Sequence, residues 1–174
     1  MDDTPLAVFF NYSIYPDILV YIDNEEDRDD IQYTKMMFSA DLVGFTRNHI
    51  KSLIGSTVTP VFFNGLKGEL LTKILCPEDR IKSCDVTGKI LAEGVQKVWN
   101  ETEAIRKFRI ATYKDSYFFE SKDLPIEKYE TEINLIVLND TNALVTIPAE
   151  LSCSYDAPMK MKAKELGFKL SFLD

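Results

Sequence analysis

The chain has 174 residues, of which 45% are hydrophobic and 28% charged, and its 20 basic and 28 acidic residues give a net charge of −8. This composition suffices for the core of one ordinary domain and excludes a disordered chain. The acidic balance argues against general nucleic-acid binding, because that affinity depends on cations that neutralise phosphates. We therefore expect a single domain over residues 1–174 that binds no nucleic acid.

Two features bear on compartment and cofactors. The longest uncharged runs, such as 6–16, are too short to cross a bilayer, and residues 1–5 lack the basic segment of a signal peptide. Cys76, Cys84 and Cys153 are an odd number without a CxxC pair, so neither a disulfide framework nor a zinc site is indicated. We expect a cytoplasmic protein without membrane contact, cofactor or metal.

The first third of the chain reads as strands. Residues 6–15 and 18–23 are rich in Val, Ile, Phe and Tyr, and Pro16-Asp17 separates them, which predicts a hairpin. Residues 31–38 are expected to return as a third strand.

A helix follows, over about residues 39–55. Its apolar stripe repeats at three- and four-residue steps and consists of Leu42, Phe45, His49, Ile50 and Leu53. Ser39 is the expected N-cap, and Gly55 lies just past the end. The spacing predicts that Leu42, Phe45 and Leu53 face the core.

Residues 57–63 are β-branched and aromatic and end at Asn64-Gly65, the dipeptide most typical of a tight hairpin turn. Residues 69–75 are the expected returning strand, although their Leu and Ile pairs also fit a short helix.

A second helix is predicted over about residues 86–105, beginning near Asp85. Its stripe consists of Leu91, Val95, Val98, Trp99 and Thr102. Gly88 and Gly94 weaken this helix by about 1 kcal/mol each relative to Ala. Both glycines would also let another backbone approach closely.

The C-terminal third returns to strands. They are expected at 108–112, 117–120, 132–138 and 143–147. Four strong turn formers at 139–142 predict a hairpin. Residues 157–166 fit a short helix stopped by Gly167, with a last strand at 168–173. The fold class is therefore α+β, with a largely antiparallel sheet and two main helices.

Catalytic motifs are scarce. His49 is the single histidine and lies within a helical stripe, so we interpret it as a partly buried packing residue. No nucleophile elbow accompanies it, and the glycines near 64–68 and 87–89 match no phosphate-binding loop. We expect no catalytic residues and no enzyme activity.

The sequence feature that points most clearly to a site is an acidic run after an apolar strand. Residues 23–30 hold six acids and Arg28, so the run carries five of the eight net negative charges. We interpret it as a solvated or partner-facing loop. Its predicted partner-binding residues are Asp23, Glu25, Glu26, Asp27, Asp29 and Asp30.

Metal binding is the alternative interpretation of the run. Asp23, Glu25 and Asp27 could ligate Mg²⁺ in a phosphoesterase or nuclease, because a hard cation prefers several oxygen ligands. An EF-hand fits poorly, since Arg28 occupies its glycine position and Thr34 its closing glutamate position.

These observations favour a non-catalytic structural or adaptor subunit acting through protein–protein contacts in an oligomeric assembly such as a bacteriophage particle. The phage setting, with a virion location, rests on composition, since Lys outnumbers Arg fifteen to five. Aromatic residues on predicted strands could anchor identical subunits: Tyr12, Tyr15, Tyr21, Tyr117, Phe118 and Phe119. An acidic inhibitor or immunity protein that presents residues 23–30 to a basic surface is a further alternative.

Overall fold

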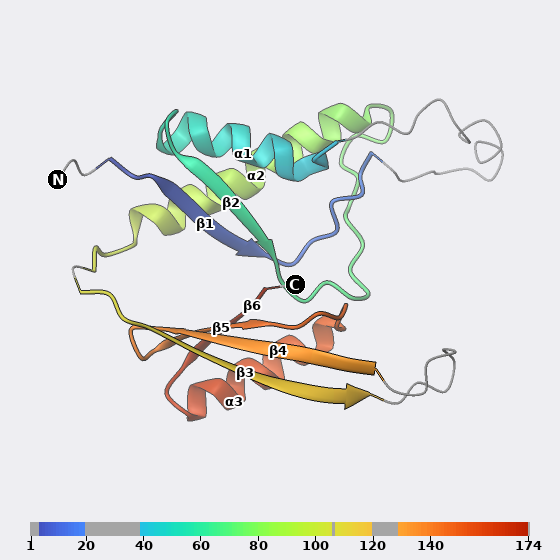
Figure 1. Ribbon diagram of the computed structural model, residues 1–174. Coiled ribbons are helices and arrows are strands. Elements are labelled where there is room, and N and C mark those ends of the chain that lie inside the picture. The colour runs from blue at the N-terminus through green and yellow to red at the C-terminus, as the bar shows by residue number, and fades with distance from the viewer. Residues whose placement is uncertain (1–3, 20–38, 106, 120–128, 174) are drawn as a thin grey trace. The chain divides into compact units, whose positions relative to one another are not determined.

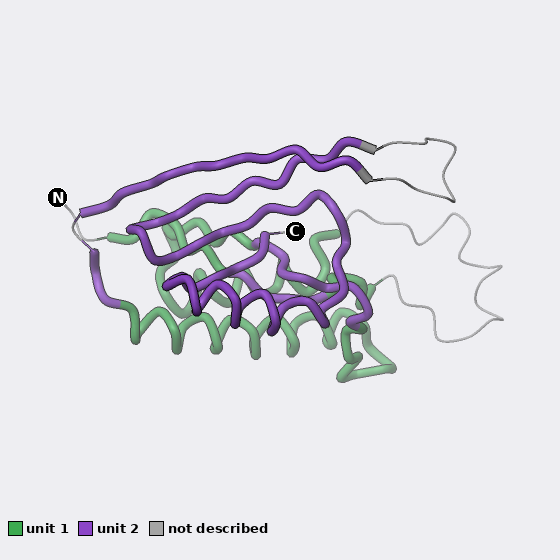
Figure 2. The backbone as a smooth tube through the Cα atoms, turned by 90° about the horizontal axis from the view of Figure 1, so that it is seen from below, with its two compact units in different colours: residues 1–10, 15–62, 71–102 green, residues 11–14, 63–70, 103–174 purple. Residues whose placement is uncertain are grey.

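A computed structural model describes residues 4–19, 39–105, 107–119 and 129–173. Within these ranges the chain forms three α-helices and six β-strands, so the α+β class expected from the sequence is confirmed. The chain divides into two compact units, which are coloured separately in Figure 2. The first comprises residues 1–10, 15–62 and 71–102, and the second comprises residues 11–14, 63–70 and 103–174. The single domain expected over 1–174 stays a prediction.

The first unit contains two long helices and most of a two-stranded sheet. Its elements are β1 (Ala7–Tyr12), α1 (Asp41–Ile54), β2 (Thr59–Asn64) and α2 (Arg80–Asn100). The last residues of both strands belong to the second unit.

The two strands of this sheet run parallel (Figure 1). The Thr59 N–H donates to Leu6 O at 3.0 Å, and the Gly65 N–H donates to Tyr12 O at 3.2 Å. Parallel strands need a long crossover instead of a tight turn. The chain from β1 through α1 to β2 supplies it.

The core of the first unit lies between the sheet and the helices. Its buried residues are Val8, Phe10, Ile50, Val58 and Ala92, against which Ile54, Phe62, Leu91 and Val95 pack. The rings of Phe10 and Phe62 lie 5.3 Å apart, tilted by 45°, a geometry that aromatic pairs favour.

Close packing of α1 against α2 depends on Gly88. A Cβ atom there would lie 2.8 Å from both Phe45 Cβ and Thr46 N, whereas one at Gly94 would meet nothing within 4 Å. The close backbone approach predicted from sequence is confirmed at Gly88 and wrong at Gly94.

The second unit is built on a four-stranded sheet of order β3-β4-β5-β6 (Figure 1). Its elements are β3 (Ile110–Phe119), β4 (Tyr129–Leu138), β5 (Asn142–Thr146), the 3-10 helix η2 (Cys153–Tyr155), α3 (Asp156–Glu165) and β6 (Lys169–Leu173). The first three strands are antiparallel neighbours, and β6 runs parallel to β5. Helix α3 packs against β6.

Local signals located the hairpin between β4 and β5 and the end of α3 correctly. Asn139 and Asp140 both adopt positive φ, of 50° and 61°, in the hairpin between β4 and β5. Gly167 follows α3 with φ +87°, as expected for a residue that stops a helix. The separate strands expected at 108–112 and 117–120 are parts of one strand, β3.

Two hairpins predicted from sequence are wrong. The partner of β1 is β2, while Ile18 and Leu19 form a turn, and the rest of the expected strand at 18–23 lies outside the described residues. The strand expected at 31–38 also lies outside them. Asn64-Gly65 makes no hairpin, because residues 69–75 form neither strand nor helix.

The bounds of the two main helices differ from the prediction. In α1 the N-cap is Ala40, and the Ser39 hydroxyl accepts the Asp41 N–H at 3.0 Å. Leu53 is 38% exposed, so its expected core position is wrong. Ile54 packs on the core in its place.

Helix α2 begins six residues before the predicted start at 86, at Arg80. The Asp79 side chain caps it by accepting the Lys82 N–H at 2.9 Å. Small residues make up its buried side: Ser83, Cys84, Gly88 and Ala92. The prediction used the spacing of large apolar residues and therefore did not include the first turns of α2.

Candidate functional site

The partner-binding residues predicted from the acidic run lie outside the described residues. They are Asp23, Glu25, Glu26, Asp27, Asp29 and Asp30. The structure describes the chain up to Leu19 and again from Ser39. The role of the run stays a prediction.

Asp41 is a buried carboxylate at the start of α1. Its Oδ2 accepts the Leu19 N–H at 2.8 Å, and its Oδ1 accepts the Leu42 N–H at 2.7 Å. The Cys84 thiol on α2 donates to the same Oδ1 at 3.7 Å. Asp41 has a φ of 49°, which Asp adopts more readily than most residues. Its carboxylate thus links both helices to the segment after β1.

The environment of this carboxylate also affects its neighbours. Burial, with further contributions from the charge and hydrogen bond of Asp41, raises the pKa of the Cys84 thiol to about 12. Such a thiol stays protonated near neutral pH and is a poor nucleophile. Desolvation raises the pKa of Asp17, and the charge of Asp41 adds to this effect, while hydrogen bonds from the backbone and from Thr72 oppose it. The surroundings of Asp41 therefore favour the uncharged forms of Cys84 and Asp17.

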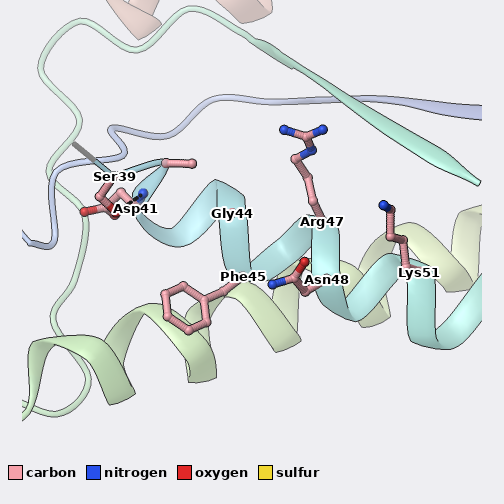
Figure 3. A pocket seen from close by; sticks show the side chains of 8 residues that line it. Ser39, Asp41, Gly44, Phe45, Arg47, Asn48 and Lys51 are labelled. Carbon is pink, nitrogen blue, oxygen red and sulfur yellow. Dashed lines mark hydrogen bonds between the residues drawn. The ribbon is translucent and has the colours of Figure 1, made fainter. Parts of the chain in front are cut away.

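A shallow pocket of about 310 Å³ opens beside the first half of α1 (Figure 3). Its lining residues are Ser39, Ala40, Asp41, Gly44, Phe45, Arg47, Asn48 and Lys51. Arg47 and Lys51 extend from the same side of the helix, away from Phe45 (Figure 3). Both cations are exposed. They could attract an anion, but an exposed ion pair contributes little binding energy.

His49 links the two long helices. Its Nε2 lies 2.7 Å from Asp85 Oδ1, and both side chains are partly exposed. The partly buried position matches the sequence interpretation, but the sequence did not reveal the partner on α2. Asp85 contacts one ring nitrogen of His49, as an orienting carboxylate does in a catalytic triad.

The described residues contain no group of three or more His, Cys, Asp or Glu side chains that could hold a metal ion. None of the three cysteines is in a disulfide. The expectation of no enzyme activity stays a prediction.

The second unit carries a different kind of candidate, a contact surface on β3. Ile110, Tyr113, Tyr117 and Phe118 are exposed by 60%, 63%, 46% and 67%, and we call these four residues the β3 surface. β3 lies at one edge of its sheet, and among the described strands it pairs with β4 alone. An edge strand presents backbone N–H and C=O groups that another chain can bind.

Two of the four residues, Tyr117 and Phe118, are interface anchors expected from the sequence; both are exposed, and their role in a contact stays a prediction. The sequence did not single out Ile110 and Tyr113. A sequence pattern that could have indicated Ile110 and Tyr113 is the lack of alternation between polar and apolar residues at 108–119, which places apolar residues on both faces of the strand.

No known protein family matches the chain, and neither a curated protein nor a solved structure matches it. Among the helices that the structure describes, none combines the length and the apolar character needed to cross a membrane.

Proposed function

We propose that the protein is a non-catalytic structural or adaptor subunit that acts through protein–protein contacts in an oligomeric assembly. The β3 surface is the observation that carries this proposal. The strand exposes apolar side chains on both faces, with Ile110 and Phe118 on one and Tyr113 and Tyr117 on the other, beside a backbone edge that another chain can bind. A long apolar edge strand without a covering partner is also prone to aggregation.

Six of the nineteen exposed large apolar side chains in the described residues lie just before or within β3. They are Ile105, Phe108, Ile110, Tyr113, Tyr117 and Phe118. Large aromatic side chains supply most of the binding energy in many interfaces, because they bury much area with few rotatable bonds. This concentration supports subunit contact better than solubility of an isolated chain.

The setting of the assembly is also part of the proposal. A phage particle would place the protein in the virion, and another assembly would place it in the cytoplasm. Identical subunits are the first proposed partner. The acidic residues 23–30 are proposed to face a basic surface of another protein, whose encounter complementary charge would accelerate.

The solution mass tests this function. A chain of 19.9 kDa should give a multiple of that mass by sedimentation equilibrium at micromolar concentration. A single-chain mass over the whole accessible concentration range would overturn the oligomeric subunit.

An activity assay tests the non-catalytic part. We expect no turnover of generic phosphodiesters with Mg²⁺ or Mn²⁺. Metal-dependent turnover that disappears in Asp23→Asn would replace the proposal with the phosphoesterase or nuclease alternative.

A further inference from the structure

Half of the backbone groups of β3 point away from the sheet. The Asn139 N–H donates to Arg109 O at 2.9 Å, and hydrogen-bonded pairs alternate along antiparallel strands. Residues at odd positions of β3 therefore bond to β4, and those at even positions, from 110 to 118, direct N–H and C=O outward. The outward Ser116 N–H donates to the Asp115 side chain at 2.9 Å, in agreement with this assignment.

The apolar face of the sheet continues past the region that the fold covers. Phe172 on β6, Ala143 on β5 and Val137 on β4 are exposed by 2%, 4% and 8%. The register places these residues on the same face as Tyr113 and Tyr117. Burial on this face therefore falls towards β3, where Ala111, opposite Val137, is half-buried and Tyr113 and Tyr117 are exposed by 63% and 46%.

We propose that β3 pairs antiparallel with β3 of a second copy of this chain, about a two-fold axis that passes through the Lys114 pair. This proposal rests on the proposed function and specifies the subunit contact. Pairing would join two four-stranded sheets into a continuous sheet of eight strands. It would use the outward backbone groups of the even-numbered residues from 110 to 118 in both copies, with the Ser116 N–H exchanging the Asp115 side chain for the second copy.

The strand is self-complementary in this register. The facing residues would be Ile110 with Phe118, Ala111 with Tyr117, Thr112 with Ser116, and Tyr113 with Asp115. An apolar pair closes each end, the small Ala111 leaves room for a tyrosine ring, and Thr–Ser pairs are favourable across strands. Tyr113 also lies diagonal to both tyrosines of the second copy, within reach of aromatic side chains.

The central pair brings two lysines together, and an edge lysine usually prevents pairing. Here Lys114 Nζ bonds to Glu132 Oε2 on β4 at 2.9 Å, so each copy brings its own counter-charge. A two-fold axis at Asp115 would place Asp115 opposite Asp115 without such a cation and would set Thr112 against Phe118. An axis at Tyr113 would set Ile110 against Ser116 and put Phe118 beyond the start of the facing β3, so the axis at Lys114 fits better.

The test uses charge substitutions at the paired ends, read out by sedimentation equilibrium on the full chain. Ile110→Lys and Phe118→Glu should each raise the dimer dissociation constant by roughly tenfold or more, because each leaves charges against an apolar partner at both ends of the interface. The double variant I110K/F118E places opposite charges face to face at both ends. It should recover most of the lost affinity.

Met161→Lys is the matched control, because Met161 on α3 is 67% exposed, as is Phe118. It should leave the dissociation constant unchanged, and circular dichroism should show that all four variants fold. If neither single variant changes the dissociation constant, the proposed β3 contact is wrong, while the proposed oligomeric function is still supported. Loss in the single variants without recovery in I110K/F118E would overturn this register. A wild-type chain that stays monomeric would overturn both proposals.

Discussion

At the scale of single residues, burial decides the chemistry of the first unit. The Asp41 carboxylate accepts hydrogen bonds from the Leu19 and Leu42 N–H groups and from the Cys84 thiol. The same surroundings disfavour a thiolate at Cys84 and a charged carboxylate at Asp17. Desolvation penalises any charged form that lacks a compensating partner.

Cys84 should therefore resist modification in the folded protein. With its thiol fully buried and its pKa raised to about 12, it should stay unmodified by iodoacetamide at pH 8 while the denatured chain reacts at all three cysteines. Peptide mass spectrometry gives the site-by-site extent. Alkylation of Cys84 as rapid as that of the half-buried Cys76 and Cys153 would contradict its burial.

Asp17 predicts a pH-dependent effect. Its pKa is raised from the ordinary value of 3.8, so the folded state binds this proton more tightly than the unfolded state. The contribution to stability is present below the unfolded pKa and is lost as pH rises through the folded pKa. Asp17→Asn should thus increase the free energy of unfolding at pH 7 and change it little at pH 3.5. Urea titrations at both values measure it, and a loss of stability at pH 7 would reverse the sign.

At the scale of elements, the contact between α1 and α2 depends on one missing side chain. Gly88 lies against the backbone and Cβ atoms of α1, while Gly94 on the same helix faces open space. The sequence does not distinguish the two glycines, but Gly88 allows α1 to approach and Gly94 does not contact it.

Alanine substitutions separate these roles. Gly88→Ala should cost about 1–3 kcal/mol of unfolding free energy, because the added methyl group forces the helices apart. Gly94→Ala should stabilise the protein by up to about 1 kcal/mol through helix propensity. Chemical denaturation measures both, and equal effects of the two substitutions would show that α2 does not approach α1 at Gly88.

Burial along α1 gives a second contrast. Ile50 is fully buried and Leu53 is not. Ile50→Ala should cost about 2–5 kcal/mol through lost burial and a cavity, and Leu53→Ala should cost well under half as much. Similar losses of unfolding free energy in both variants would place Leu53 in the core after all.

At the scale of the whole molecule, net charge opposes self-association. Each chain carries a charge of −8, so two copies repel one another. Salt screens this repulsion, because the Debye length falls from about 30 Å at 0.01 M salt to about 10 Å at 0.1 M. Association through the β3 surface is mainly apolar and is opposed by this repulsion.

Salt should therefore strengthen the assembly. The dissociation constant from sedimentation should fall between 0.01 M and 0.15 M salt. Replacing Glu25, Glu26, Asp29 and Asp30 by their amides halves the net charge of −8 and should reduce this salt dependence. If salt instead weakened the assembly, the acidic run would be making the subunit contact.

Local chemistry in the sequence was enough to predict the hairpin between β4 and β5 and the end of α3. Asn139 and Asp140 tolerate the positive φ of a tight hairpin, and Gly167 does so at the end of α3. These preferences act within a few residues, so they are readable without the rest of the fold. The α+β class and the approximate position of α1 follow from apolar spacing in the same way.

Tertiary structure decided what depends on distant partners. β1 pairs with β2 only after α1 has crossed between them, and no short-range pattern distinguishes that pairing from a hairpin with residues 18–23. The buried side of α2 consists of small residues because α1 comes close at Gly88. The exposure of the β3 surface likewise depends on the position of β3 at the edge of its sheet. Each of these outcomes is set by contacts between residues far apart in sequence, whose identities alone do not specify which of them meet.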